Sequence, residues 1–137
     1  MRSDIVLAFD FGLKYTGVAV GQTITKTAKG ATTLRCKDGQ PRWHEVATLV
    51  ERYTPRKLIV GLPLNMDGSD SDMSARAREF AAKLGNRFNL DVDLQDERLT
   101  SRSAQDGLTE AIQQGLVKTD HELAAVIIAE DWLRSLT

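Results

Sequence analysis

Hydrophobic and polar positions along the first third of the chain follow the periods of strands. Residues 5–11, IVLAFDF, are almost all apolar, as expected of a strand that is buried on both faces. Residues 17–22 and, more weakly, 25–34 indicate two further strands, and the short glycine-bounded loop after residue 11 predicts an antiparallel hairpin. The cluster CKDGQP at 36–41 predicts a turn.

The rest of the chain alternates between helical and strand patterns. Helices are predicted at 42–53, 71–88, 101–114 and from 119 onward, and strands at 57–63 and 90–97. Ser71 or Ser69 can cap the helix at 71–88, and TDHE at 119–122 matches a capping box with Thr119 as N-cap and Glu122 at N3. Right-handed crossovers between parallel strands place helices on both faces of a sheet. The order therefore predicts an α/β fold of three layers with a mixed five-stranded sheet.

Composition adds limits on what the protein can be. The 137 residues are 42% hydrophobic and 27% charged, which suits one globular domain. A formal net charge of −1 lacks the overall basic character of many nucleic-acid binders, although local patches matter more than the sum. Cys36 is the only cysteine, which excludes an intrachain disulfide and a cysteine-based zinc site. The longest apolar run, Leu123–Ala129, is too short to span a bilayer, so the sequence predicts a cytosolic protein with no membrane partner.

Asp10 stands near the end of the buried first strand. An ionised carboxylate is costly there unless it is protonated, paired or bound to a cation. In open α/β sheets, ligands gather beyond the carboxyl ends of the parallel strands. If the first, fourth and fifth predicted strands are parallel neighbours, polar residues at their ends converge on one edge of the sheet: Asp10, then Asn65 and Asp67, then Asp96 and Glu97. Strand alternation lets one acid of the last pair point to the site while the other faces solvent.

A group of carboxylates suggests what binds at this edge. Several of them can ionise within a few ångströms only if a cation neutralises them. Oxygen ligands, in a chain with one cysteine and two histidines, favour Mg²⁺ or Mn²⁺ over zinc. Two such ions commonly support phosphodiester hydrolysis, in which one activates water and the other stabilises the leaving oxygen. The residues alone thus predict a divalent-metal site.

Four ordered blocks of the sequence, AFDFGLKYTGVAVG, IVGLPLNMDGS, ARAREFAAKL and DERLTSRSA, closely resemble the YqgF family of Holliday-junction-resolvase-like proteins. The resemblance runs through almost the whole chain. It implies that residues 1–137 form a single RNase H-like nuclease domain that works in the cytoplasm and matures the 5′ end of 16S rRNA during ribosome biogenesis. The partners that it implies are pre-16S rRNA and ribosomal precursor particles. The family is also related to a resolvase that cleaves four-way DNA junctions.

The resemblance also implies which residues form the site. Asp10 matches the acid of the family's first strand and Glu97 the acid of its DER block, which makes both of them expected metal ligands and catalytic residues. The family's third acid begins the last helix, typically as Asp followed by xxAA. Counting back from Ala124–Ala125, that position holds His121, and Asp120 lies one residue earlier.

A helix turns about 100° per residue, so the side chain of Asp120 points about 100° away from the direction of the family's third acid unless the start of the helix is shifted. Asp120 as a third carboxylate ligand, or His121 as a ligand or a general acid/base, can therefore complete the catalytic group. Four polar or basic residues near the acids are expected to hold phosphates of a nucleic acid: Lys14, Asn65, Arg98 and Arg102.

Three functions remain open from the sequence. The first is a metal-dependent endonuclease acting on structured RNA, and the second is a resolvase of branched DNA that uses the same acids. The third is a non-catalytic RNA- or ribosome-binding factor that kept the fold and lost the third ligand. A nucleotide phosphohydrolase is a weaker alternative, because 137 residues are too few for the two domains that clamp ATP in actin-like folds.

Overall fold

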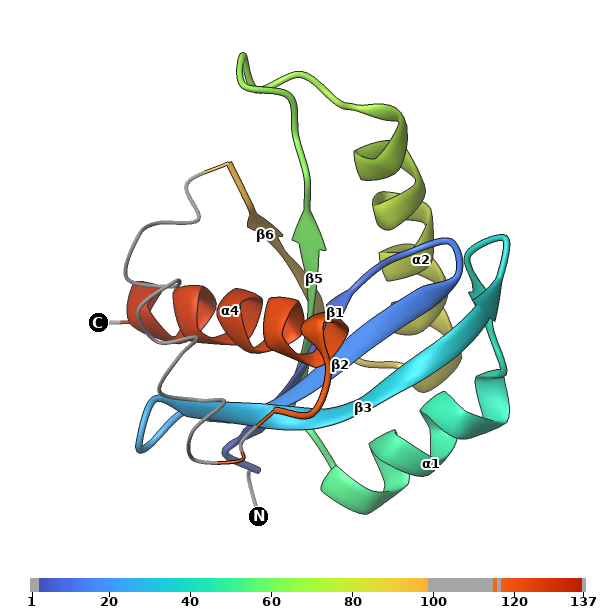
Figure 1. Cartoon of the computed structure of the whole chain (residues 1–137). Coiled ribbons are helices and arrows are strands. Elements are labelled where there is room, and N and C mark those ends of the chain that lie inside the picture. The colour runs from blue at the N-terminus through green and yellow to red at the C-terminus, as the bar shows by residue number, and fades with distance from the viewer. Residues whose placement is uncertain (1–2, 99–114, 116, 137) are drawn as a thin grey trace.

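The computed structural model describes residues 3–98, 115 and 117–136 of the chain. It is built around a six-stranded sheet in the order β4-β3-β2-β1-β5-β6 (Figure 1). The strands are β1 (Ile5–Asp10), β2 (Tyr15–Gln22), β3 (Thr27–Lys37), β4 (Gln40–Pro41), β5 (Lys57–Leu62) and β6 (Val92–Asp96). The helices among the described residues are α1 (Trp43–Tyr53), α2 (Asp72–Phe88) and α4 (Asp120–Ser135). None of these helices combines the length and apolar character that a membrane span requires.

Strand β1 joins the antiparallel and the parallel halves of the sheet. It pairs antiparallel with β2, where Asp10 lies opposite Gly17, and parallel with β5, where Phe9 lies opposite Val60. Strand β5 then pairs in parallel with β6. The predicted neighbourhood of the first, fourth and fifth predicted strands is therefore confirmed, and the carboxyl ends of β1, β5 and β6 share one edge of the sheet.

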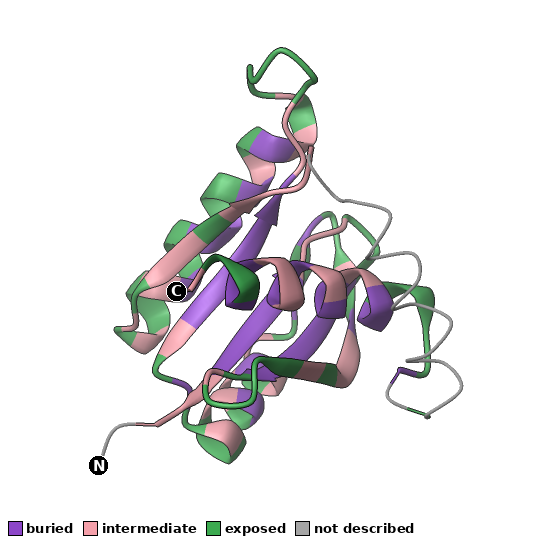
Figure 2. Cartoon of the chain, turned by 90° about the vertical axis from the view of Figure 1, so that its left-hand side faces the viewer, coloured by how far each residue is buried: buried purple, intermediate pink, exposed green. Residues whose placement is uncertain are grey.

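Helices cover both faces of the sheet, which confirms the three predicted layers. Helix α4 crosses one face, whereas α1 and α2 lie on the other (Figure 1). Side chains of β1 alternate between two cores: Leu7 and Phe9 pack toward α1 and α2, and Val6 and Ala8 pack toward α4. All four are fully buried, which explains the continuous apolar run. Figure 2 shows the buried residues gathered in the central strands and on the sheet-facing sides of the helices.

The two longer helices begin as the sequence predicts. Ser71 caps α2, because its hydroxyl accepts a hydrogen bond from the Ser74 N–H while the Ser71 N–H donates to the Ser74 hydroxyl. Thr119 caps α4, and its hydroxyl accepts a hydrogen bond of 3.0 Å from the Glu122 N–H. The Glu122 carboxylate lies against Gly30 of β3 and does not return to the Thr119 N–H, so the predicted capping box forms only in its threonine half.

The predicted number of five strands is wrong by one. Gln40 and Pro41 form the short strand β4, which pairs with Cys36 and Lys37, inside the cluster that the sequence analysis assigned to a turn. The turn itself is reduced to Asp38–Gly39, because both residues have positive φ and close a two-residue hairpin whose flanking residues can then pair. The predicted helix at 101–114 lies outside the described residues.

Candidate active site

Asp10 and Glu97 approach each other across strand β5. Asp10 ends β1, and Glu97 follows β6, where its backbone N–H donates a hydrogen bond of 3.1 Å to the Leu62 carbonyl of β5. Between these strands lies Gly61, and a Cβ atom built there would be only 2.8 Å from the Glu97 carboxyl carbon. The missing side chain at Gly61 thus lets the Glu97 carboxylate lie over β5, on the side toward β1.

Burial and mutual repulsion govern the charges of the two acids. Desolvation raises the pKa of Asp10 and the charge of the neighbouring His121 offsets part of that rise, so that the pKa goes from 3.8 to about 6. Three effects raise the pKa of Glu97 from 4.5 to about 7: desolvation is the largest, and the negative charges of Asp10 and then Asp96 add to it. The effect of Asp10 on the pKa of Glu97 is the electrostatic sign that the two carboxylates share a site.

His121 joins this site through the start of helix α4. A Cβ atom at Gly17, which lies opposite Asp10 on β2, would collide with the backbone carbonyl of His121. The absence of a side chain at Gly17 therefore allows the first turn of α4 to rest directly on β2. The His121 ring stacks on the exposed ring of Tyr15, with centroids 5.1 Å apart and an interplanar angle of 30°.

Asp120 lies one residue before His121, in the same exposed first turn of α4. It is not among the groups that shift the pKa of Asp10 or of Glu97, whereas His121 lowers the pKa of Asp10. Within the described part of the chain, no three His, Cys, Asp or Glu side chains lie close enough together to hold one metal ion. The geometry thus brings together two carboxylates and an imidazole.

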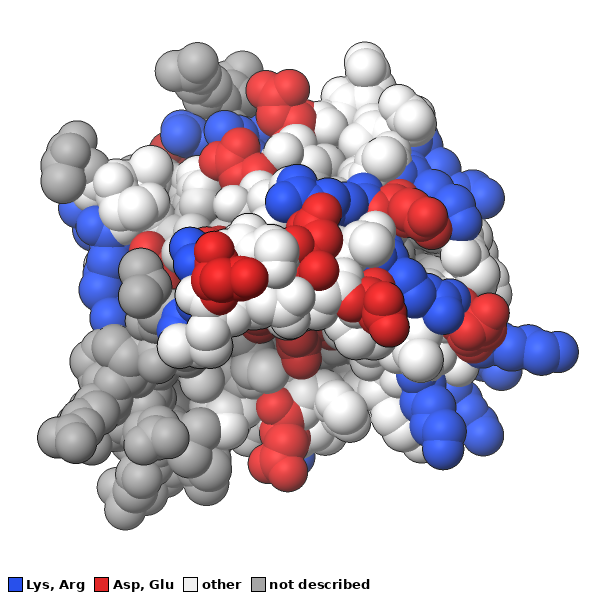
Figure 3. Space-filling view, turned by 90° about the horizontal axis from the view of Figure 1, so that it is seen from above, with Lys and Arg blue, Asp and Glu red and all other residues white. Residues whose placement is uncertain are grey.

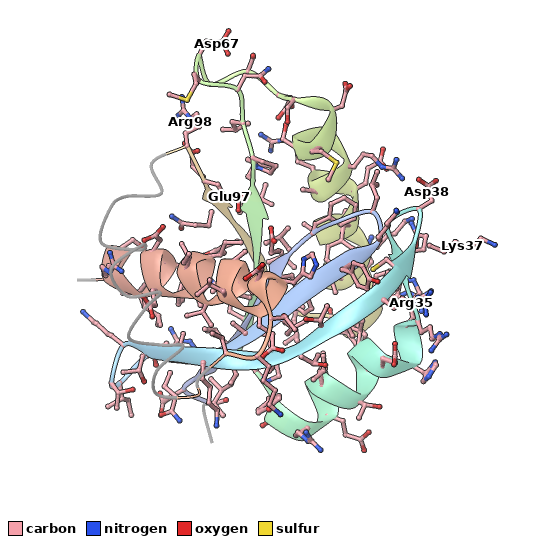
Figure 4. All side chains as sticks on the ribbon, viewed as in Figure 1. Arg35, Lys37, Asp38, Asp67, Glu97 and Arg98 are labelled. Atoms are coloured by element: carbon pink, nitrogen blue, oxygen red, sulfur yellow. The ribbon has the colours of Figure 1, made fainter. Side chains whose placement is uncertain are left out.

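Asp96, the acid next to Glu97 in the sequence, faces away from this site. Asp96 accepts hydrogen bonds from the Arg98 guanidinium, with the shortest N–O distance at 2.8 Å, and this pairing lowers the pKa of Asp96. The Arg98 guanidinium also donates to the Met66 carbonyl of the loop after β5. Figure 4 shows Glu97 low between the strands and Arg98 above it, beside that loop. The predicted division of roles between Asp96 and Glu97 agrees with this arrangement.

Side chains of the loop after β5 mainly hold the loop itself. The Asn65 amide donates to the Ser69 hydroxyl and to the Asp70 carbonyl, while Asp67 accepts from the Ser69 N–H and hydroxyl. Asp67 lies at the exposed tip, far above Glu97 in Figure 4. The structure therefore does not bring Asp67 to the carboxylates, and the Asn65 amide is engaged within its own loop.

Of the two remaining predicted phosphate contacts, the structure describes Lys14. Lys14 is exposed in the loop between β1 and β2, and its carbonyl accepts a hydrogen bond of 2.7 Å from the Cys36 N–H of β3. Arg102 lies outside the described residues. Seen along the carboxyl ends of the strands in Figure 3, acidic side chains spread over the middle of the molecule, and Lys and Arg side chains lie along its right-hand edge and also at its left-hand edge.

The sequence alone did not reveal the roles of three residues that shape this site. Gly17 and Gly61 lie inside strands, where an isolated glycine signals close approach of another part of the chain, and that signal could have found both. Tyr15 begins β2 and supplies the ring against His121. Nothing local to Tyr15 predicts that contact, because it depends on where α4 crosses the sheet.

Comparison with known proteins places this arrangement in a family. The RuvX family, described as Holliday junction resolvase, matches residues 4–135. A relative from Actinobacillus pleuropneumoniae is 44% identical over 132 residues, covering 95% of this chain and 96% of its own length. One from Yersinia pestis is 43% identical over 137 residues and covers 96% of each chain. Both carry the name "Putative pre-16S rRNA nuclease".

Solved structures show the same fold at low sequence identity. Thermus thermophilus RuvC in complex with a Holliday junction substrate has a TM-score of 0.60 at 14% identity, over 92% of this chain and 90% of that one. The fowlpox virus Holliday junction resolvase has a TM-score of 0.54 at 17% identity, over 97% and 99%. The predicted RNase H-like fold and the resemblance to YqgF are thereby confirmed. The chain belongs to the YqgF/RuvX family of Holliday-junction-resolvase-like nucleases.

Proposed function

We propose that this protein is a divalent-metal-dependent endonuclease that processes the 5′ end of pre-16S rRNA in the cytoplasm, on ribosomal precursor particles. The observation that carries the proposal is the meeting of Asp10 and Glu97 over Gly61, at the shared carboxyl edge of three parallel strands. The names of the relatives support pre-16S rRNA as the substrate.

Asp10 and Glu97 fit the role of metal ligands. Burial and their like charges oppose ionisation of both carboxyl groups, and a divalent cation between them would reverse both effects. Mg²⁺ and Mn²⁺ prefer oxygen ligands, and Mg²⁺ is commonly bound by one or two carboxylates together with water and substrate phosphate. Such a metal supplies a water of lowered pKa and stabilises the developing charge on the phosphate.

His121 is placed to move a proton at the reacting phosphate. Its ring is held against Tyr15 at the exposed start of α4, and it is close enough to Asp10 to influence that carboxyl group. An imidazole can both accept and donate a proton, which suits it to protonating a leaving oxygen. We therefore assign proton transfer to His121. Asp120 would serve as a third carboxylate ligand if the first turn of α4 shifted.

Cleavage of pre-16S rRNA tests the proposal. The wild type with Mg²⁺ or Mn²⁺ should cut the precursor, and Asp10→Asn should reduce the rate at least about 100-fold, because it removes a ligand charge in the water-excluded part of the site. Asp91→Asn is a matched control, since Asp91 is an exposed acid just before β6 and should not affect the rate. Equal rates in wild type and Asp10→Asn would contradict the nuclease assignment.

Branched DNA is the alternative substrate that the solved structures favour, because the Thermus thermophilus neighbour was determined with a Holliday junction. Both substrates would use the same acids. A competition experiment with a labelled RNA precursor and an unlabelled four-way junction decides between them. Preferential cleavage of the junction at equal concentrations would replace RNA by branched DNA as the substrate.

A non-catalytic binding role is favoured by one feature, the histidine at the position of the family's third acid. Calorimetry with Mn²⁺ separates this role from the nuclease. Binding with an affinity that Asp10→Asn or Glu97→Gln weakens supports the nuclease. Absence of binding at millimolar Mn²⁺, with RNA binding retained, supports the binding factor.

A further inference from the structure

Three basic side chains at the β3–β4 hairpin have no acidic partner. Arg35, Lys37 and Arg42 form no ion pair with any residue in the described part of the chain. The acid of the hairpin turn, Asp38, is instead paired with Arg76 of α2 at 3.1 Å. Unpaired Lys and Arg side chains gathered on one element are typical of sites for phosphate groups.

We infer that these residues form a phosphate track that holds the substrate strand beside the catalytic carboxylates, an inference that rests on the proposed function and names its substrate contact. The occupant is the sugar-phosphate backbone of an RNA strand. The track is defined by Arg35 and Lys37, with Arg42 at its side, and Tyr15 lies between it and the acids.

Strand register places the track on the same face of the sheet as the acids. Arg35 lies directly opposite Tyr15 in the antiparallel pair β2–β3, and paired residues point to the same face. Tyr15 contacts His121 of α4, and the Thr33 hydroxyl is 2.8 Å from that of Thr119, so this is the face that α4 covers. Lys37 follows Arg35 by two residues and so points the same way.

The distance between Asp10 and Arg35 suits an RNA strand that runs from the reacting phosphate toward the hairpin. Asp10 on β1 and Arg35 on β3 are two strand positions apart, or roughly 10 Å across the sheet, and Arg35 lies a further two residues along, about 7 Å. An RNA strand that lies across the sheet can therefore place one phosphate at the acids and a second phosphate at Arg35. Figure 4 shows Arg35 and Lys37 on the same side of the view, with Lys37 extending outward from the hairpin.

The hairpin also provides space for the backbone. A hollow of about 330 Å³ is lined by Arg35, Cys36, Lys37, Gln40 and Arg42. The residues that line it carry guanidinium, ammonium and amide groups, which donate hydrogen bonds to phosphate oxygens. Burial raises the pKa of the Cys36 thiol, which lies on the other face of β3, and the charge of Glu45 of α1 adds to that rise.

The test is the salt dependence of RNA binding. Fluorescein-labelled U20 RNA is titrated with protein in EDTA at several salt concentrations, so that cleavage does not interfere. Each phosphate contact contributes about 0.7 to the slope of log affinity against log salt for a single strand. The double variant Arg35→Ala/Lys37→Ala should bind more weakly, with a slope smaller by about 1.4. An unchanged slope would overturn the track.

A matched control removes the same charge elsewhere. Lys29→Ala/Arg52→Ala neutralises a residue on the opposite face of β3, since Lys29 pairs with Val20 of the α1–α2 core, and another on α1. This control variant should retain the wild-type slope. A decrease in slope equal to that of Arg35→Ala/Lys37→Ala would overturn the assignment of the track to Arg35 and Lys37. If the alanine variant has a lower melting temperature than the wild type, Arg35→Gln/Lys37→Gln repeats the measurement with long side chains.

Two further arms separate this inference from the proposed function. U20 bound more tightly than dT20 supports RNA as the occupant, and the reverse order overturns it. If Arg35→Ala/Lys37→Ala lowers the slope but wild-type protein does not cut RNA, the track stands and the nuclease fails. If wild-type protein cuts RNA and the slope is unchanged in the variant, the nuclease stands and the track fails.

Discussion

Asp10 and Glu97 have pKa values of about 6 and 7, so the metal-free protein near neutral pH holds two carboxyl groups that resist ionisation. In the unfolded chain both would ionise with pKa values close to 3.8 and 4.5. The folded state therefore binds protons more tightly than the unfolded state between about pH 4 and pH 7. Within this window, the contribution of these groups to the free energy of unfolding decreases as the pH rises.

This linkage predicts a pH-dependent and metal-dependent stability. Without metal, Asp10→Asn/Glu97→Gln should melt at a higher temperature than wild type at pH 8, and the difference should disappear below about pH 3, where the wild-type acids are protonated in both states. Adding Mn²⁺ at pH 8 should raise the melting temperature of wild type only, and EDTA should reverse it. Melting curves by circular dichroism measure both effects. A wild type that is more stable than the variant at pH 8 in EDTA would contradict the prediction.

Replacement of Gly61 by alanine should reduce cleavage activity more than it reduces stability. In Gly61→Ala, the new Cβ would lie 2.8 Å from the Glu97 carboxyl carbon and 2.5 Å from Ile128 Cδ1, so the carboxylate must move away from its present place. We expect RNA cleavage to fall at least about 10-fold, with a loss of stability of about 1–3 kcal/mol from overpacking.

The control for Gly61 is Gly21→Ala on the same face of the sheet. There the new Cβ would be 3.2 Å from the side-chain ends of Leu133 and Val6, which can shift, and no acid of the site is near. Cleavage rate and thermal melting are measured for both variants. Similar activities in the two variants would show that Gly61 does not position Glu97.

At the scale of helices and strands, the side chain of Thr119 holds the first turn of α4 in place. The Thr119 hydroxyl caps the helix and lies 2.8 Å from the Thr33 hydroxyl of β3, and His121 follows two residues later. Thr119→Ala should lower the free energy of unfolding by about 1 kcal/mol and reduce cleavage, because the turn that carries His121 loses its anchor. Thr119→Ser keeps the hydroxyl and should retain most of both. If serine and alanine behave alike in melting and cleavage, the cap does not hold the site.

Most elements could be predicted from the sequence because their signals are local. The buried runs gave β1 and β5, and the serine and threonine caps gave the starts of α2 and α4. The short strand β4 was missed, since two residues carry no period and pair only because Asp38 and Gly39 turn the chain tightly. Asp10 and Glu97 could be predicted from strand ends and resemblance, whereas Tyr15 and the track at Arg35 depend on register across the sheet, which local patterns do not encode.

At the scale of the whole molecule, the central strands contribute side chains to both cores. Alternate residues of β1 and β5 pack on opposite faces, so unfolding of these strands would expose both cores to solvent. Helix α4 reinforces this along its length. Its start rests on Gly17 of β2, and near its end the Trp132 indole N–H donates a hydrogen bond to Asp93 of β6. We therefore expect the two layers to unfold together.

The two tryptophans test this cooperativity, because each reports on one layer. Trp43 lies against Phe80 and Arg87 on the α1–α2 side, whereas Trp132 belongs to the core under α4. In Trp43→Phe the remaining fluorescence follows the α4 layer, and in Trp132→Phe it follows the other. In each variant, the urea midpoint by fluorescence should coincide with that by far-ultraviolet circular dichroism, as two-state unfolding requires. A fluorescence midpoint that precedes the circular dichroism midpoint in one variant only would show that the layer it reports unfolds first, and that the sheet does not couple the two cores.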